Sequence, residues 1–263
     1  MRNIKYYVVD SFADKIFSGN PAGVCLLENH IDEKMMQNIA KENNLAETAF
    51  VVRNGNNFDL RWFTPEVEIN LCGHATLASA FIISNFLDTD RDEMRFNTKS
   101  GELIVVRKED LYEMDFPAWE VKPVEITQLM RDSFNVQISE AHLSRDLLLL
   151  VNSEEDVKKA IPDMDLLRKI PDCFGVIITA KGKAVDFVSR CFAPNAGIPE
   201  DPVTGSSHSE LIPFWAKRLN KKIMTAKQLS KRGGTLYCEH CGSRVKIAGN
   251  AVLYMTGEIV CQC

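Results

Sequence analysis

The chain has 263 residues, of which 45% are hydrophobic and 25% charged, and its formal net charge is −5 at pH 7. This composition is typical of a globular protein, and the length suits one large domain or two of about 130 residues. Because phosphate binding needs a basic surface, an acidic chain without lysine- or arginine-rich runs is not expected to bind nucleic acid. The longest aliphatic run, Leu147–Val151, is far shorter than the ~20 residues of a membrane span, and the N-terminus has no signal-peptide core. We therefore expect a cytoplasmic protein with no membrane partner and with its eight cysteines reduced.

The first half of the chain predicts short strands arranged around one apolar helix. Asp32 precedes a segment with helical spacing and is expected to cap it. Two prolines and no periodicity mark Phe116–Pro123 as a linker. The predicted strands are Ile4–Asp10, the end of Phe17–Leu27, Asn43–Val52, Phe58–Phe63, Arg95–Thr98, Leu103–Lys108 and Leu111–Phe116, and the predicted helices are Asp32–Glu42 and Thr76–Phe86.

The second half repeats this plan, with one apolar helix among many short strands. The predicted helices are Ile126–Phe134, Ser153–Ala160, Pro162–Ile170 and Ser207–Leu219, and the predicted strands are His142–Val151, Phe174–Thr179, Val185–Arg190, Lys227–Ser230, Gly234–Cys238, Gly242–Ile247 and a strand pair within Ala251–Val260. Many short strands with one dominant helix per half predict an α+β fold.

An internal repeat relates the two halves. The stretches Leu60–Ala80 and Val188–Leu211 match when 129 is added to the residue number. This offset is about half the chain length, so we expect two similar halves with the chemistry between them. The residue pairs that it matches are Arg61 with Arg190, Phe63 with Phe192, Pro65 with Pro194, Ile69 with Ile198 and Cys72 with Asp201.

Each repeated stretch places a glycine where an apolar helix is expected to begin, Gly73 in the first half and Gly205 in the second. The N-terminus of a helix carries roughly half a positive charge and presents backbone N–H groups, and it therefore binds carboxylates or stabilises a developing anion. Glycine lets a ligand approach the backbone closely. Two such helix starts predict a small substrate that carries a carboxylate and reacts through an enolate-like state.

Several side chains near these helix starts can move protons or bind the substrate. Glu47 lies among apolar neighbours that would raise its pKa towards neutral, so it is the first candidate for a general acid or base. Asp201 is the second, although an aspartate before Pro202 can also serve as a turn or cap residue. His74 is a candidate for proton transfer or substrate contact, and Cys72 is a minor acid–base candidate. The remaining candidates for binding the substrate are Asn20, Ser206, which can also cap the helix, and His208, which suits a structural role equally well.

The chain resembles the PhzF-like family of phenazine-biosynthesis proteins, and through it the diaminopimelate epimerase-like fold. The motifs that carry the resemblance are VDSF at Val9–Phe12, SGNPAGV at Ser18–Val24, NLAETAFV at Asn44–Val51, RWFTPEVEINLCGHATLASA at Arg61–Ala80 and EDPVTGSSH at Glu200–His208. Their order and spacing extend over most of the chain.

The resemblance implies two pseudo-symmetric halves, each a curved, many-stranded sheet wrapped around a central helix. We place the first half at residues 1–116, completed by the last strand near 252–263, and the second half at residues 117–251. The family scaffold is an isomerase that uses no cofactor, and it is compatible with a homodimer. In its phenazine member, the residues that match Glu47, His74, Asp201 and Ser206 form the site, and the glutamate shuttles a proton between two carbons.

Related epimerases use two cysteines as the acid–base pair, one from each half. This chain keeps Cys72 but has Asp201 at the matching position of the second half. The resemblance therefore favours Glu47 over a mechanism with two thiols. We expect an isomerase or epimerase that moves a proton between carbons of a small carboxylate-bearing metabolite, whose identity the sequence leaves open.

Two alternatives to this enzyme follow from the sequence. One is a protein that keeps the fold but binds a ligand or a protein partner without catalysis. The other is a zinc module made of the CxxC at Cys238 and Cys241 and the CxC at Cys261 and Cys263. Because the segment between these pairs has the pattern of a sheet hairpin, we expect no metal there. The sequence also lacks GxGxxG and phosphate-loop signatures, so no nucleotide cofactor is expected.

Overall fold

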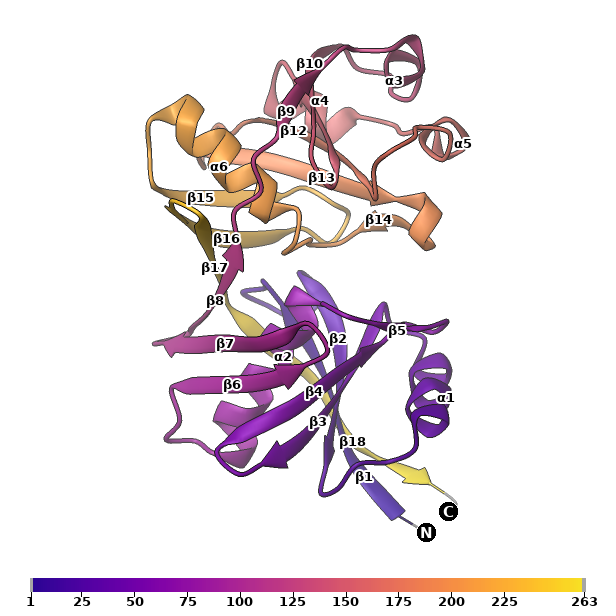
Figure 1. Ribbon diagram of the computed structural model, residues 1–263, viewed down its shortest axis with the longest axis vertical. Coiled ribbons are helices and arrows are strands. Elements are labelled where there is room, and N and C mark those ends of the chain that lie inside the picture. The colour runs from indigo at the N-terminus through magenta and orange to yellow at the C-terminus, as the bar shows by residue number, and fades with distance from the viewer. Residues whose placement is uncertain (1, 262–263) are drawn as a thin grey trace. The chain divides into compact units, whose positions relative to one another are not determined.

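The computed structural model describes residues 2–261, and the chain folds into two compact units (Figure 1). The first unit comprises the chain up to Asp115 together with the segment from Ala248 onward, and the second unit comprises Phe116–Ile247. No helix in the described part of the chain is long and apolar enough to cross a membrane.

The first unit is a mixed sheet that curves around a buried helix. The strands of the sheet lie side by side in the order β18, β1, β2, β3, β4, β6, β7 and β8. The pairs β2–β3 and β4–β6 are parallel, and the other pairs are antiparallel. A short strand, β5, pairs with the end of β4. The bounds of these strands are β1 Arg2–Ser11, β2 Asn20–Leu27, β3 Glu47–Asn54, β4 Asn57–Phe63, β5 Glu68–Ile69, β6 Glu93–Thr98, β7 Gly101–Lys108, β8 Leu111–Pro117 and β18 Ala251–Cys261.

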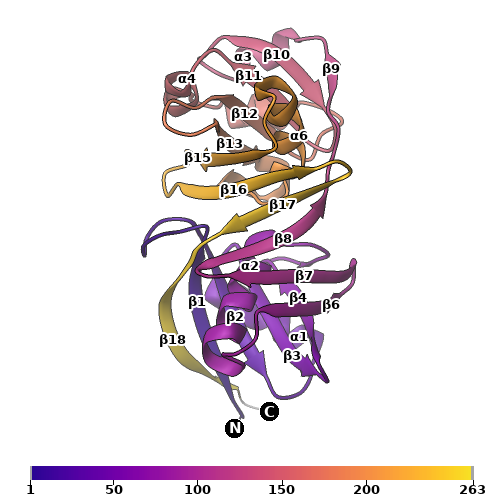
Figure 2. The same cartoon turned by 90° about the vertical axis from the view of Figure 1, so that its left-hand side faces the viewer.

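Helix α2 (Gly73–Ile82) forms the centre of the first unit (Figure 2). It contacts β1, β2, β3, β7 and β18, and nearly all of its side chains are buried. Its composition explains this, because alanine and small polar residues let the surrounding strands approach from every side. The helix continues as a π-helical turn over Ile83–Leu87. On the outside of the sheet lies α1 (Glu33–Asn43), capped by Asp32, whose carboxylate accepts from the Lys34 N–H at 3.1 Å, as predicted.

The second unit repeats this topology. The order β9, β10, β11, β12, β13, β15 and β16 includes parallel pairs at β11–β12 and β13–β15, with antiparallel pairs elsewhere and a short β14 on β13. The bounds of its strands are β9 Lys122–Val124, β10 Ile138–Leu143, β11 Leu147–Val151, β12 Val176–Lys181, β13 Phe187–Ala193, β14 Ile198–Asp201, β15 Ile223–Gln228, β16 Gly234–Cys241 and β17 Arg244–Gly249, and its helices are α3 Gln128–Asp132, α4 Glu154–Lys159, α5 Met164–Leu167 and α6 His208–Leu219.

The predicted α+β fold with two pseudo-symmetric halves is confirmed by this shared strand pattern. The repeat extends to side chains: Arg61 on β4 forms a bidentate pair with Glu68 on β5, and Arg190 on β13 forms the same pair with Glu200 on β14. Because the guanidinium plane matches the carboxylate, such a pair fixes the short strand in one orientation.

Helix α6 contains Pro213, which has no N–H to donate to the carbonyl of Ser209 one turn earlier. That carbonyl accepts instead from the backbone N–H of Trp119, at 2.8 Å. The Ser209 carbonyl, which Pro213 leaves without a helical partner, therefore connects the segment after β8 to the start of α6. Two residues after Pro213 on the same helix, Trp215 stacks on Phe187, with ring centroids 5.8 Å apart.

Four sequence predictions about elements were wrong. His142–Val151 is not one strand, because the turn at Ser144–Asp146 separates β10 from β11 and folds them into an antiparallel pair. Ala251–Val260 is not a strand pair but part of the single strand β18, since it pairs with β1 over its whole length. The strand predicted at Lys227–Ser230 lies earlier, at Ile223–Gln228. The apolar helix begins at Gly73, as the repeated stretch predicted, but its α-helical pattern ends at Ile82 and not at Phe86.

Candidate functional site

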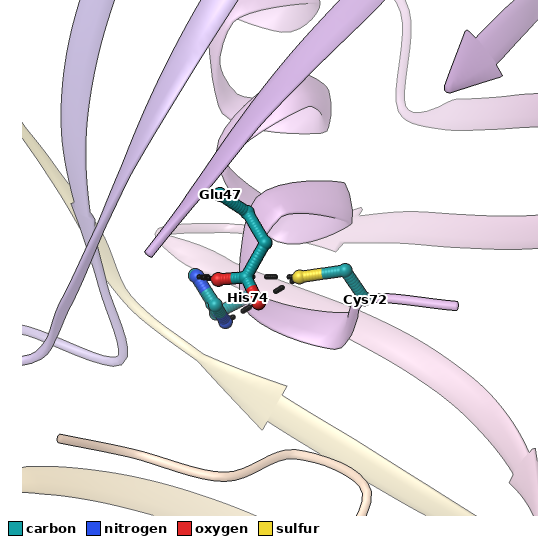
Figure 3. Close-up of side chains that lie close together, drawn as sticks. All are labelled: Glu47, Cys72 and His74. Carbon is teal, nitrogen blue, oxygen red and sulfur yellow. Dashed lines mark hydrogen bonds and ion pairs between the residues drawn. The ribbon is translucent and has the colours of Figure 1, made fainter. Parts of the chain in front are cut away.

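Three buried side chains meet at the start of α2: Glu47, Cys72 and His74 (Figure 3). His74 Nε2 lies 3.0 Å from Glu47 Oε2 and forms an ion pair with it. The Cys72 sulfur lies 3.5 Å from His74 Nδ1 and 4.0 Å from Nε2. Glu47 and His74 are each only 6% exposed. A carboxylate, an imidazole and a thiol thus share one largely dehydrated space.

The topology explains why these residues meet. Glu47 is the first residue of β3 and Asn20 the first of β2, and the two strands are parallel with Ala22 opposite Glu47. The N-terminal ends of both strands therefore lie at the same edge of the sheet. Cys72 occupies the N-cap position of α2, and His74 is the second residue of that helix.

Several hydrogen bonds hold His74 in place. Asn20 Nδ2 lies 3.2 Å from His74 Nδ1, and Ser11 Oγ donates to the His74 carbonyl at 2.7 Å. With Asn20 as donor, the N–H of a neutral His74 is on Nε2, the nitrogen that faces Glu47. Thr76 Oγ1 donates to the Cys72 carbonyl at 2.5 Å and secures the first turn of the helix. The ring is thus fixed with one nitrogen towards Glu47.

The charges in this cluster are coupled. Burial opposes charge on His74, but the interactions with the Cys72 sulfur and the Glu47 carboxylate outweigh it, so the pKa of His74 lies well above its ordinary value. Burial, reinforced by the negative charge of Glu47, raises the pKa of the Cys72 thiol. The two shifts favour the protonated form of His74 and the neutral form of the Cys72 thiol.

The predicted site residues Asp201 and His208 belong to the second unit, and both form hydrogen bonds with Thr204. Thr204 Oγ1 donates to Asp201 Oδ2 at 2.6 Å, and the Thr204 carbonyl lies 2.8 Å from His208 Nδ1. Asp201 ends β14, and Gly205 and Ser206 lie in the hydrogen-bonded turn before α6. The second helix starts later than the offset of 129 places it, and so Asp201 does not occupy the N-cap position that Cys72 has in α2.

The imidazole of His208 has no exposed surface and packs against Phe187, with ring centroids 5.9 Å apart. Burial lowers its pKa to about 4. A neutral ring that is enclosed by the core and bonded to the Thr204 carbonyl before α6 has the properties of a structural residue. These contacts support the structural alternative for His208 over contact with a substrate.

Sequence reasoning missed a charged cluster beside Ser206. Arg145 Nη2 donates to Asp146 Oδ2 at 2.8 Å and to Ser206 Oγ at 3.1 Å. The guanidinium lies 5.1 Å from the ring of Trp119 and 4.9 Å from that of Phe174, and the two aromatic side chains hold it in place. The Ser144–Asp146 segment was assigned to a strand, and its turn residues were the signal that could have revealed this site.

The CxxC of the sequence does not form a pair of metal ligands. Cys238 and Cys241 both lie on β16, where residues three apart point to opposite faces. Cys238 is accordingly 2% exposed and faces the core, whereas Cys241 is exposed. Cys261 ends β18, and Cys263 lies outside the described residues.

Comparison with known proteins places this chain in a family. A family model described as phenazine biosynthesis-like protein, PhzC-PhzF, matches residues 9–257. An uncharacterized isomerase of Pseudomonas aeruginosa is 46% identical over 253 residues, covering 96% of this chain and 97% of its own length. A mouse phenazine biosynthesis-like domain-containing protein is 39% identical, covering 96% of this chain and 98% of its own.

Solved structures show the same fold. The crystal structure of a PhzF-family phenazine biosynthesis protein from Enterococcus faecalis has a TM-score of 0.98 and 47% identity, and the match covers 99% of this chain and 100% of that one. A hydroxyproline epimerase from Agrobacterium vitis, with bound trans-4-hydroxy-L-proline, has a TM-score of 0.63 at 10% identity, covering 98% of this chain and 92% of that one. The latter likeness concerns the fold, which is thus related to that of epimerases.

Proposed function

Since this chain belongs to the PhzC-PhzF family of phenazine biosynthesis-like proteins, we propose that it is an isomerase that moves a proton between carbons of a small carboxylate-bearing metabolite, with Glu47 as the acid–base group. The observation that supports this most directly is the buried pair of Glu47 Oε2 and His74 Nε2, 3.0 Å apart at the start of α2. Relatives at 46% and 47% identity are named isomerases.

In the proposed reaction, the Glu47 carboxylate removes a proton from a carbon next to the substrate's electron-withdrawing group. The electron pair remains on the substrate as an enolate-like anion, and Glu47 returns the proton to another carbon or to the other face. Protons alone are exchanged, so the step needs no redox partner. A general acid–base group of this kind contributes about 10²–10⁴-fold in rate.

His74 is proposed to assist Glu47 through the ion pair. A protonated imidazole can pair with the carboxylate before the reaction and can donate to the developing anion. The backbone at Gly73 adds the partial positive charge of the helix start. The parts assigned to Asp201 and Ser206 in the sequence analysis remain predictions, which Asp201→Asn and Ser206→Ala test in the assay below.

Solvent deuterium exchange tests the proposal. The protein is incubated in D₂O with a panel of cyclic and linear amino and hydroxy acids that includes trans-4-hydroxy-L-proline, and NMR measures deuterium at carbon. We expect exchange into at least one acid, reduced at least 100-fold in Glu47→Gln. Glu42→Gln, on the exposed face of α1, makes the same change of charge and should keep full activity.

Two outcomes would contradict the proposal. Undiminished exchange in Glu47→Gln would remove the acid–base role from Glu47. Acids that raise the melting temperature of the wild-type protein without exchanging any proton would support the alternative of a ligand-binding member of the family.

A further inference from the structure

The first unit contains a cavity of about 260 Å³ that none of Glu47, Cys72 and His74 lines. Its walls come from the end of α2, the turn between β7 and β8, the loop after β1 and the start of β18. Small-molecule sites have volumes from about 300 Å³ upward, so this cavity suits a ligand of amino-acid size. From the charges on its walls we infer that the cavity binds a small α-amino acid in its zwitterionic form.

Arg107, at the end of β7, supplies the positive charge of the cavity. Its Nε donates to the Glu109 carbonyl at 3.2 Å, and its Nη1 lies 3.5 Å from the Ser84 carbonyl. Both acceptors are backbone oxygens, and Arg107 forms no ion pair with any residue in the range 2–261. A guanidinium presents five donors in a plane that matches a carboxylate. Arg107 therefore has donors left for the carboxylate of a ligand.

Three carboxylates supply the negative charges. Asp14 lies in the loop after β1, and Glu109 and Asp110 form the turn between β7 and β8. All three residues are exposed, and none of them forms an ion pair within the described part of the chain. These carboxylates would repel a purely anionic ligand, whereas a simple cation would leave Arg107 without an anion. A ligand that carries both charges satisfies the whole set.

The backbone at Glu109 points to a role for its side chain. Lys108 pairs with Leu111, so the hairpin turn has two residues, and Glu109 is the first of them. Its φ of 57° lies in the left-handed region, where such turns favour glycine, asparagine or aspartate. A glutamate there is strained, and strained backbone positions cluster at functional sites and ligand clamps. A carboxylate is thus held at the cavity at a cost in local stability.

A hydrogen-bonded network fixes another part of the wall. Asn85 Nδ2 donates to the Phe81 carbonyl at 2.8 Å and to the Tyr112 hydroxyl at 2.9 Å. The same hydroxyl lies 2.8 Å from Ser84 Oγ. Asn85 belongs to the π-helical turn that follows α2, and π-helical turns occur frequently at functional sites. Because the amide nitrogen is engaged, Asn85 Oδ1 is left to accept from the ammonium group of a ligand.

These groups assign each end of the amino acid to a partner. The ligand carboxylate pairs with Arg107, and its ammonium group pairs with Glu109 or Asp110. Binding makes and breaks no covalent bond. The inference goes beyond the proposed function and does not depend on it, because the cavity and the acid–base cluster have no residue in common.

Isothermal titration calorimetry of the full-length protein with L-alanine, L-glutamine and L-leucine, each separately, tests the inference. We expect at least one of them to bind, with affinity reduced at least tenfold in Arg107→Gln and in Glu109→Gln. Arg53→Gln is the matched control, because it removes an exposed arginine that pairs with Asp88, and it should keep the wild-type affinity. Circular dichroism verifies that each variant is folded.

Two ligand analogues test the two charges without any variant. The N-acetyl derivative of the bound amino acid lacks the ammonium group and its amide lacks the carboxylate, so each should bind at least tenfold more weakly. The affinity in Glu47→Gln should equal that of the wild type, which separates this cavity from the acid–base cluster. The inference is overturned if none of the three amino acids binds, if the N-acetyl derivative binds as tightly as the amino acid, or if affinity is lost in Glu47→Gln and kept in Arg107→Gln.

Discussion

Glu210 Oε1 accepts a hydrogen bond from the backbone N–H of Asp146 at 2.9 Å, and neither residue has any exposed surface. A glutamate in the first turn of α6 thus holds the turn between β10 and β11. Burial, together with the negative charge of Asp146, raises the pKa of Glu210 to about 8. This carboxyl group is therefore protonated in the folded protein over a pH range where it is ionised in the unfolded chain.

The first prediction concerns stability at rising pH. Between pH 4.5 and 8 the folded state holds the Glu210 proton that the unfolded state has lost, so the free energy of unfolding falls as pH rises through this window. The loss is about 1.4 kcal/mol for each pH unit. Glu210→Gln keeps the acceptor oxygen but cannot ionise, so it should lose less stability between pH 5 and 8. Urea unfolding at several pH values measures this, with exposed Glu155→Gln as the control; equal slopes in all three proteins would refute it.

The second prediction concerns acid pH and His208. The pKa of this buried ring is about 4, compared with 6.5 for a free histidine, so the unfolded state takes up a proton first as pH falls. Stability should therefore be lost between pH 6.5 and 4, at up to about 1.4 kcal/mol per pH unit. His208→Asn, which can still donate to the Thr204 carbonyl, should be less stable at pH 7 but should lose less on acidification. An unchanged loss of stability on acidification in His208→Asn would contradict this prediction.

The third prediction concerns the pair of Arg145 and Asp146. Arg145→Met leaves the buried Asp146 carboxylate without its cation and should reduce the free energy of unfolding by about 2 kcal/mol. The value is below that of a fully buried pair because Arg145 is one-third exposed. Adding Asp146→Asn should restore part of the loss, and a double-mutant cycle in urea measures the coupling. Additive single changes would show that the pair does not interact.

The fourth prediction concerns Asn20 as a positioning residue for His74. Asn20→Ala removes the contact with His74 Nδ1 and lets the ring turn away from Glu47, so deuterium exchange should slow about tenfold. NMR of the histidine nitrogens should show a changed tautomer or protonation, which a purely structural loss would not produce. Asn56→Ala, on the exposed turn before β4, is the matched control. Wild-type exchange and wild-type histidine spectra in Asn20→Ala would exclude this role.

Much of the architecture follows from local patterns in the chain. The cap at Asp32 and the repeat that relates Arg61 to Arg190 can both be read from the sequence, because they depend on neighbouring residues or on a fixed spacing. Turns and registers were harder to predict. The Ser144–Asp146 turn is short and lies between two apolar strands, so the segment was predicted as one strand. Nothing local in the sequence distinguishes a strand pair from the long strand β18.

The candidate site shows the same division. The residue types of Glu47, Cys72 and His74 suggested chemistry from the sequence alone. The contact of Glu47 with the other two, however, depends on the parallel pairing of β2 with β3 and on the way α2 packs inside the sheet, because Glu47 is at least 25 positions from both in the chain. Likewise, the contact of His208 with Phe187 and the contact of Arg145 with Trp119 arise from packing between distant segments. Side-chain chemistry is a property of each residue, whereas proximity, burial and the resulting pKa shifts exist only once the chain has folded.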